Sequence, residues 1–220
     1  MLATLDAVVL QRWLIDFLIF VASLTVHEWA HAWTAHRLGD DTALRQGRVT
    51  FNPVVHIDPI GTIAMPIFNL VLRVMGSNFG MIGWARPVPV DPRNLKHPVR
   101  DDLLITLAGP GSNLVLCLLG GLVGGLFLRF APDARPLVYS FVYINALLAV
   151  FNMIPLPPLD GSHVLRHAIG MSAEAYYGLA RWSMLILLVL INVPGFVRLL
   201  TLGTALVASP FFALVESVRG

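Results

Sequence analysis

The sequence predicts an all-α polytopic membrane protein with about five transmembrane helices. Of its 220 residues, 56% are hydrophobic and only 13% are charged, and the mean hydropathy is +0.74. This composition is typical of an integral membrane protein rather than a soluble domain. The net charge of +2 is too small to indicate a nucleic-acid partner. A single cysteine, Cys117, excludes an internal disulfide and a cysteine-based metal site.

Long apolar segments predict the individual spans. They cover residues 8–38, 103–130, 137–154, 176–193 and 196–215, and each is long enough to supply the 17–25 residues that a spanning helix needs. Residues 60–75 are also apolar but short, so we expect a re-entrant or interfacial segment there. Residues 45–51 alternate weakly and predict a short strand. The alternating prolines of residues 86–92 exclude a helix and predict an extended segment.

The first span contains the clearest functional signal, His27-Glu28-Trp29-Ala30-His31. On a helix, His27 and His31 lie one turn apart on one face and together can bind one Zn²⁺. Glu28 is then placed to act as general base on a water molecule that the zinc activates. A charged group at membrane depth costs about 2.5–3.5 kcal/mol on insertion scales, which favours a functional role.

A catalytic zinc usually takes three protein ligands, so two histidines need a partner. Asp160 has the best context, because prolines break the preceding helix and Gly161 permits a turn that directs the carboxylate into the bundle. The other candidates for this position are Asp58, His56, His163 and His167. His163 and His167 are four residues apart, so they form either a second metal pair or the polar face of an interfacial helix.

The topology of the chain decides whether Asp160 can reach the two histidines. If residues 60–75 dip into the membrane and return, His31 and Asp160 lie on the same side; if they cross, the two lie on opposite sides. The dip places ten of the counted basic residues, including Arg219, on the metal side and four on the other, against eight and six for a full span. The positive-inside rule therefore favours the dip, with the N-terminus outside and the metal end facing the cytoplasm.

Three further polar residues are candidates for the site. Zinc-assisted peptide hydrolysis builds up an oxyanion that needs a hydrogen-bond donor, and Asn152, near the end of the third span, is placed for that role. Asn113 follows a Gly109-Pro110-Gly111 break, and it serves either the site or an interhelical hydrogen bond. His56 is a candidate for contact with the substrate or with a metal ligand, from the start of the dipping segment.

Three motifs carry a resemblance to a known family: His27-Glu28-Trp29-Ala30-His31, Ala108-Gly109-Pro110-Gly111-Ser112-Asn113 and Asn152-Met153-Ile154-Pro155-Leu156-Pro157-Pro158-Leu159-Asp160-Gly161. Together they resemble the site-2 protease family of intramembrane zinc metalloproteases. Residues 47–62 and 83–90 resemble its compact prokaryotic branch, so we expect no PDZ or CBS domain. The chain is then one membrane-embedded protease domain, residues 1–220, with a catalytic core of about 8–170 and additional C-terminal spans in 173–217.

The resemblance implies roles for the candidate residues. His27, His31 and Asp160 would bind Zn²⁺ and Glu28 would be the catalytic base. Two asparagines would assist: Asn152 would stabilise the oxyanion, and Asn113 would keep the substrate strand or the active site in place. The implied substrates are transmembrane segments of other proteins, cut within the lipid bilayer of a prokaryotic inner membrane after local unwinding. The extended residues 86–92 would then pair with the unwound strand.

Two other functions remain open from the sequence. A membrane metal transporter would also hold histidine and aspartate at depth, but it needs a polar path to both faces, and the outer half of the first span offers little beyond Ser23 and Thr25. A catalytically inactive family member would bind metal without cleaving. Loss of a general base at Glu28 would abolish proteolysis but not transport, which distinguishes the two activities.

Overall fold

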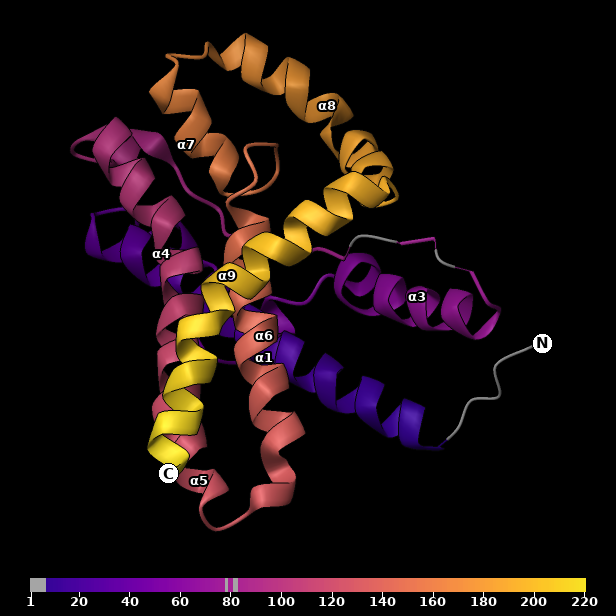
Figure 1. The fold of residues 1–220 in the computed structure, drawn as a ribbon. Coiled ribbons are helices and arrows are strands. Elements are labelled where there is room, and N and C mark those ends of the chain that lie inside the picture. Colours follow the sequence, from indigo (N-terminus) through magenta and orange to yellow (C-terminus); the bar gives the residue numbers. More distant parts are fainter. Residues whose placement is uncertain (1–6, 78, 81–82) are drawn as a thin grey trace.

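Helices make up most of the protein, and the computed structural model describes them for residues 7–77, 79–80 and 83–220. No strand occurs in this described part, as the all-α class predicts. Five helical segments are long and apolar enough to cross a membrane (Figure 1). They are α1 (Ala7–Arg37), α4 (Pro98–Leu119) with its continuation through η4 (Gly120–Gly124) and α5 (Gly125–Leu128), η5 (Pro132–Ala134) with α6 (Arg135–Asn152), α8 (Ala173–Leu190) and α9 (Pro194–Arg219).

The strand predicted for residues 45–51 is wrong. Helix α2 (Thr42–Arg45) occupies its start, and Gly47 ends the turn with a positive φ of 66°, a conformation that glycine adopts without strain. The amide of Arg48 then returns to the carbonyl oxygen of Ala43 at 2.9 Å. Because this turn satisfies its backbone groups locally, no partner strand is needed. The short helix η1 (Pro53–Val55) follows.

Residues 59–74 form a helix that leaves the bundle and does not cross the protein. A wide first turn, η2 (Pro59–Ala64), continues into α3 (Met65–Val74). The chain then returns to its starting point, where the Arg86 amide donates to the carbonyl oxygen of His56 at 2.9 Å and the Thr62 hydroxyl donates to that of Trp84 at 2.8 Å. The segment therefore leaves and returns at one place, as the predicted dip requires, and residues 83–91 are extended as the prolines require.

The bundle core lies where α4–α5, α6 and α9 meet. It consists of the buried side chains Cys117, Leu128, Val138, Val142, Ala146, Ala208 and Val215. Glycines allow the close approach: a Cβ on Gly121 would overlap Leu214, and one on Gly125 would overlap the backbone of Val215. Small residues at such contacts are the usual device for packing helices in a membrane, because lipid offers no hydrophobic driving force between them.

The last two helices differ from the expected alternation of crossings. At the end of α9, Glu216 forms an ion pair with Arg135 at 3.0 Å and accepts a hydrogen bond from Tyr139 at 2.6 Å, while Arg129 donates to the carbonyl oxygen of Val218 at 2.8 Å. The end of α9 therefore lies beside the start of α6, far from α7 (Gly161–Ala168) (Figure 1). The expectation that Arg219 lies on the metal side is wrong, and α8 and α9 together make one passage across the protein.

Short segments around the metal end complete the fold. Helix α7 (Gly161–Ala168) follows the third span, and η3 (Pro92–Asn94) precedes α4. The buried carboxylate of Asp40 joins the start of α2 to η3, because it accepts hydrogen bonds from the Thr42 amide at 3.1 Å, the Asn94 side chain at 2.8 Å and the Asp91 amide at 2.7 Å. Burial alone would raise the pKa of Asp40, but these hydrogen bonds lower it. The ionised carboxylate thus anchors the end of the extended segment.

The arrangement of α9 predicts which ends of the chain share a side of the membrane. In a Cys117→Ala background, we expect cysteines at Phe130 and Gly220 to react with a membrane-impermeant maleimide from one face of sealed vesicles, and a cysteine at Arg93 to react only from the other. Both Phe130 and Arg93 are highly exposed, so reaction depends on the side alone. Labelling of positions 93 and 220 from the same face would contradict this fold.

Candidate metal centre

His27 and His31 form one side of a compact group of metal-binding atoms. Both lie in the second half of α1 and are buried, and their i,i+4 spacing directs both rings to one face of the helix. Their Nε2 atoms are 3.1 Å apart. Two atoms that share a zinc ion at about 2.0–2.1 Å with tetrahedral angles are separated by about 3.3 Å, so the pair is already placed as a chelate.

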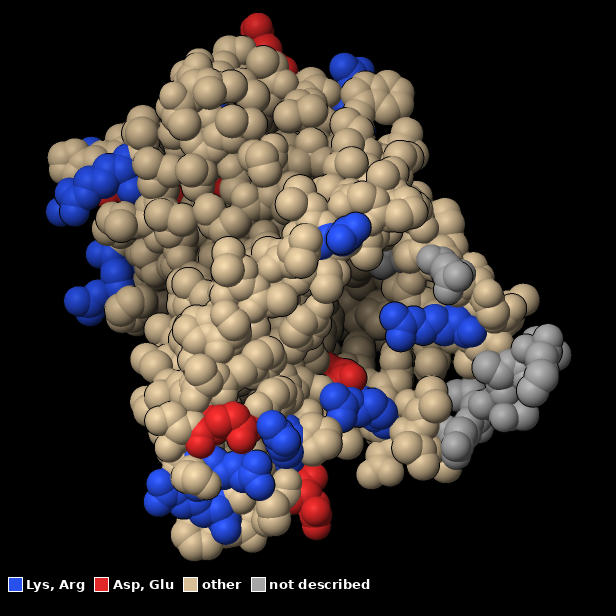
Figure 2. All heavy atoms as spheres, viewed as in Figure 1, with Lys and Arg blue, Asp and Glu red and all other residues tan. Residues whose placement is uncertain are grey.

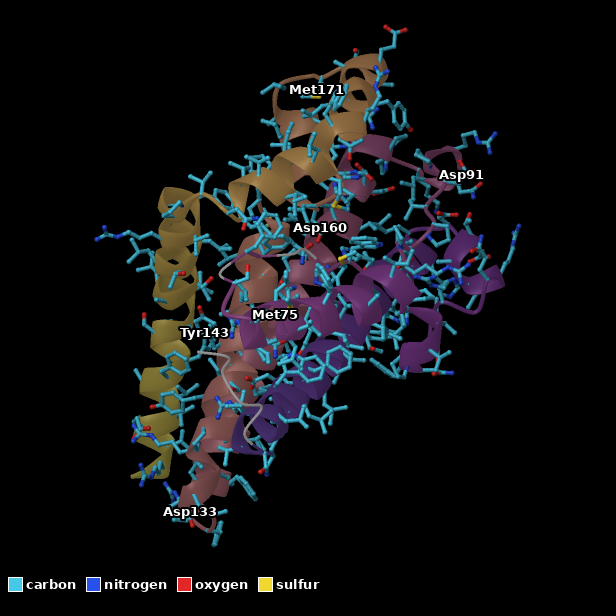
Figure 3. The ribbon with its side chains drawn as sticks, turned by 90° about the vertical axis from the view of Figure 1, so that its right-hand side faces the viewer. Met75, Asp91, Asp133, Tyr143, Asp160 and Met171 are labelled. Carbon is cyan, nitrogen blue, oxygen red and sulfur yellow. The ribbon has the colours of Figure 1, made fainter. Side chains whose placement is uncertain are left out.

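Asp160 supplies the third atom from a stretch that is remote in the sequence. Oδ2 of Asp160 lies 3.3 Å from Nε2 of His27 and Oδ1 lies 3.4 Å from Nε2 of His31, and each distance is close to the spacing of two ligand atoms on one zinc ion. Within the described chain, this is the one group of three such side chains whose ligand atoms all lie within 4.8 Å. Figure 3 shows Asp160 in the interior, among the helices of the bundle.

The local fold explains why Asp160 faces inward. After α6 ends, the chain turns sharply through Pro155–Leu159, and Gly161 lies so close to the carbonyl groups of Met153 and Ile154 that a Cβ would overlap them. Oδ2 of its carboxylate is buried and has no hydrogen-bond partner in the described chain. Asp160 can therefore offer a carboxylate oxygen to a metal, which binds the ionised form.

Hydrogen bonds to the other ring nitrogens fix the histidines in the metal-binding tautomer. Nδ1 of His27 lies 2.7 Å from Oδ1 of Asn113, and Nδ1 of His31 lies 2.7 Å from the carbonyl oxygen of Ile105. Since both partners accept, both Nδ1 atoms carry the proton, and each Nε2 keeps its lone pair for a metal. Asn113 in turn donates to Asn145 at 3.0 Å, which donates to Ser23 at 3.0 Å.

Gly109 provides the space in which the two imidazoles meet. A Cβ at this position would overlap Nε2 of both His31 and His27, so only glycine fits between α4 and the metal-binding atoms. Helix α4 continues through Gly109 and Pro110 without a break, contrary to the break expected from the sequence. The glycine thus serves close approach rather than a change in chain direction.

A cavity of about 930 Å³ extends from these residues into the bundle. Glu28 and Asn152 both line it. Glu28 follows His27 on α1 and is buried, whereas Asn152, at the end of α6, donates to the carbonyl oxygen of Leu148 at 2.9 Å. Most of the lining is apolar, from α1, α3, α6, α8 and α9, and Figure 2 shows a hollow between α3 and α9 with basic side chains at its rim.

The extended segment forms another wall of this cavity. Trp84, Ala85, Pro87, Val88 and Val90 all line it. Arg48 holds the segment from behind, because its guanidinium donates to the carbonyl oxygens of Arg86 and Pro87. This side chain is only 3% exposed. An extended backbone therefore runs along the same cavity that the metal-binding group opens into.

The other candidates for the third ligand lie elsewhere. Asp58 caps the helix at residue 59 by accepting from the amides of Ile60 and Gly61. Nε2 of His56 lies 2.9 Å from the carbonyl oxygen of Thr50, and His56 is not among the residues that line the cavity. His163 and His167 both contact Asp102 instead. Of the five candidates, only Asp160 joins the two histidines.

Sequence reasoning missed the residues that support the group. The roles of Gly109 and Asn145 depend on which helices touch, and the role of Ile105 depends on a backbone carbonyl that has no sequence signal. One sign was available: Asp102, Ile105, Gly109 and Asn113 recur at helical spacing on α4. This periodicity marks the face of α4 that is turned toward α1.

Comparison with known proteins identifies the family to which this chain belongs. A model of peptidase family M50 matches residues 128–190, which include Asn152 and Asp160 but not the histidine pair. The chain is 37% identical over 163 residues to a Bacillus subtilis protein provisionally named zinc metalloprotease YwhC, and the match covers 70% of this chain and 69% of that protein. No solved structure matches the chain.

A second relative supports the same assignment over more of the chain. A Mycolicibacterium smegmatis protein provisionally named zinc metalloprotease Rip2 is 30% identical over 190 residues, which covers 81% of this chain and 67% of that protein. The chain therefore belongs to peptidase family M50, the site-2 protease family. It is a membrane protein of the zinc metalloprotease class, as the sequence motifs predict.

The crowding at Gly109 predicts a substitution that removes zinc without removing any ligand. In the Gly109→Ala variant, the new methyl group displaces both imidazoles, so we expect at least a 100-fold loss of zinc affinity, measured by competition with a chromophoric chelator. Gly111→Ala is the matched control, since a Cβ there meets nothing within 4 Å. Normal zinc binding by Gly109→Ala would show that the histidines do not approach α4 as described.

Proposed function

We propose that this protein is an intramembrane protease that cleaves peptide bonds within transmembrane segments of other membrane proteins. The observation that carries the proposal is the position of the metal-binding group at the end of a largely apolar cavity inside a bundle of membrane-spanning length. A lipid-soluble helix is the polypeptide that such a cavity suits, because its side chains are apolar. We assign the zinc to His27, His31 and Asp160.

The residues present fit a catalytic zinc. Three nitrogen and oxygen donors with tetrahedral spacing are the usual protein contribution to a catalytic site, which keeps a fourth position open. Oδ2 of Asp160 is buried and has no hydrogen-bond partner in the described chain, as a carboxylate oxygen intended for a metal would be. When bound, zinc supplies Lewis acidity, which polarises a substrate carbonyl and makes water easier to deprotonate.

We assign the proton transfers to Glu28 and the stabilisation of the oxyanion to Asn152. Glu28 takes a proton from the attacking water and passes it to the nitrogen of the leaving amide, as a general base and then a general acid. Asn152 is the donor that we assign to the oxyanion of the tetrahedral intermediate. Its amide bonds to Leu148 of its own helix, so it must turn toward the cavity when the substrate is present.

A substrate helix must unwind locally before it can be cut, because its amides are bonded within the helix. Residues 83–91 offer an extended backbone beside the metal-binding group, and Arg48 and the His56 carbonyl fix this backbone to the protein. We propose that the unwound substrate adds to it as a strand, so that main-chain hydrogen bonds replace those lost from the helix.

The charge distribution supports a cytoplasmic orientation in a prokaryotic inner membrane. The predicted ratio of ten basic residues to four becomes nine to four, because Arg219 moves to the far side with the end of α9 and Arg198, at the junction of α8 and α9, no longer lies beyond a crossing. The excess still lies at the metal end, and the positive-inside rule places that end in the cytoplasm.

Replacement of the general base tests the proteolytic function. We expect Glu28→Gln to retain one zinc per chain, because its ligands are intact, and to lose cleavage by a factor of at least about 100. The assay uses a fluorescent transmembrane peptide with central glycine and proline residues, reconstituted with the purified enzyme in phospholipid vesicles. Glu174→Gln, on the surface at the start of α8, is the control.

Two results would contradict the proposal. Cleavage by Glu28→Gln at the wild-type rate would exclude Glu28 as the base. Zinc flux into the vesicles, undiminished in Glu28→Gln and without cleavage by the wild-type protein, would identify a transporter instead.

A further inference from the structure

A cluster of titratable side chains outside the metal-binding group joins α7 to α4. Nδ1 of His163 lies 3.1 Å from Oδ2 of Asp102, and Nε2 of His167 lies 2.6 Å from the same oxygen. Because a carboxylate accepts, both imidazoles donate to it. The side chains of Asp102 and His167 are largely buried, at 16% and 18% exposure. The i,i+4 spacing of the histidines turns both toward α4.

This cluster is not arranged as a second metal site. Among the described residues, only His27, His31 and Asp160 bring three ligand atoms within 4.8 Å of one another. In the cluster, both nitrogens meet a single carboxylate oxygen, an arrangement in which hydrogen bonds already use the atoms that would bind a metal. Its effect is mechanical: two charge-assisted contacts hold one helix against another.

The helix that it holds begins at the third metal-binding residue. Asp160 immediately precedes α7, and the chain before it is a proline-rich turn rather than a helix. With eight residues, α7 is too short to be stable alone, so its position depends on what it contacts. A shift of α7 would carry Asp160 with it and change the 3.3 and 3.4 Å distances to the histidines.

Helix α4 also fixes the other side of the metal-binding group. The Ile105 carbonyl, about one turn after Asp102, accepts from His31, and Asn113 accepts from His27. One rigid helix thus orients the histidine pair through two contacts and α7 through a third. These three contacts along α4 determine the distance between Asp160 and the two histidines.

We propose that Asp102 is a positioning residue of the metal centre, which holds α7 on α4 and thereby keeps Asp160 at ligand distance from His27 and His31. Asp102 is outside the group of three candidate metal ligands, although its side chain also lines the cavity. Its loss weakens zinc binding, because residues that orient metal ligands typically contribute 10–100-fold in affinity. The inference rests on the zinc ligands assigned above.

The test compares two neighbouring aspartates. Asp102→Asn removes the charge that holds both histidines, and we expect a zinc dissociation constant raised by about tenfold or more, measured by chelator competition on the purified protein in detergent. Asp101→Asn is the matched control, because Asp101 is even more buried, at 2% exposure, and its carboxylate accepts from the His97 amide at the start of α4 rather than from α7. Its affinity should equal that of the wild type.

A second readout separates positioning from general destabilisation. Peptide cleavage by Asp102→Asn should be low at limiting zinc and return to within about twofold of the wild type when zinc saturates the site. Unchanged affinity in Asp102→Asn, an equal loss in Asp101→Asn, or activity that stays low at saturating zinc would each overturn the proposal. If Asp102→Asn fails to fold, His167→Gln replaces it, with an expected several-fold loss of affinity and the same zinc rescue.

Two controls keep the outcomes distinct. If His27→Ala binds zinc like the wild type, the assigned ligand set fails, whatever Asp102 does. If the wild-type protein binds two equivalents of zinc and Asp102→Asn binds one, the cluster is itself a metal site and the positioning role is wrong. Since zinc affinity and stoichiometry are measured without substrate, neither of these two controls depends on proteolysis.

Discussion

The protein is built around one constraint, which is that a carboxylate must come within about 3.3 Å of two imidazoles that lie some 130 residues earlier in the chain. The histidines satisfy half of it locally, because a helix places residues i and i+4 on one face. The other half requires the third span to end on the side where the first one ends. The dipping residues 59–74 make this possible, because they leave and return without adding a crossing.

Helix α4 fixes the distance between Asp160 and the two histidines within this topology. Along one face it presents Asp102, Ile105, Gly109 and Asn113, which contact α7, His31, both histidines and His27 in turn. Ile105 contributes its backbone carbonyl group and Gly109 contributes only space, so α4 acts on the site mainly through the position of its backbone. The three candidate metal ligands lie on α1 and directly after the turn that follows α6, and α4 is the scaffold that relates them.

Much of this could be predicted from the sequence, and the failures have physical reasons. The spacing of His27 and His31 predicts that both rings lie on one face of a helix. The prolines before Asp160 predict a turn, and the short length of residues 60–75 predicts a dip. The weak alternation of residues 45–51 misled because Gly47 closes a local turn. Hydropathy identified α9 as a span but not the side of the protein on which it ends. That side follows from the ion pair between Glu216 near the end of α9 and Arg135 at the start of α6. Gly109 could not be recognised, because its role is the absence of atoms between two helices.

X-ray absorption spectroscopy of the zinc-loaded protein tests the central claim most directly. The account predicts one zinc with two imidazole nitrogens and a carboxylate oxygen at about 2.0–2.1 Å, and loss of the carboxylate contribution in Asp160→Ala while both imidazoles remain. A zinc shell that is the same in Asp160→Ala as in the wild type would contradict the account, because the two distant stretches of chain would then not share a metal.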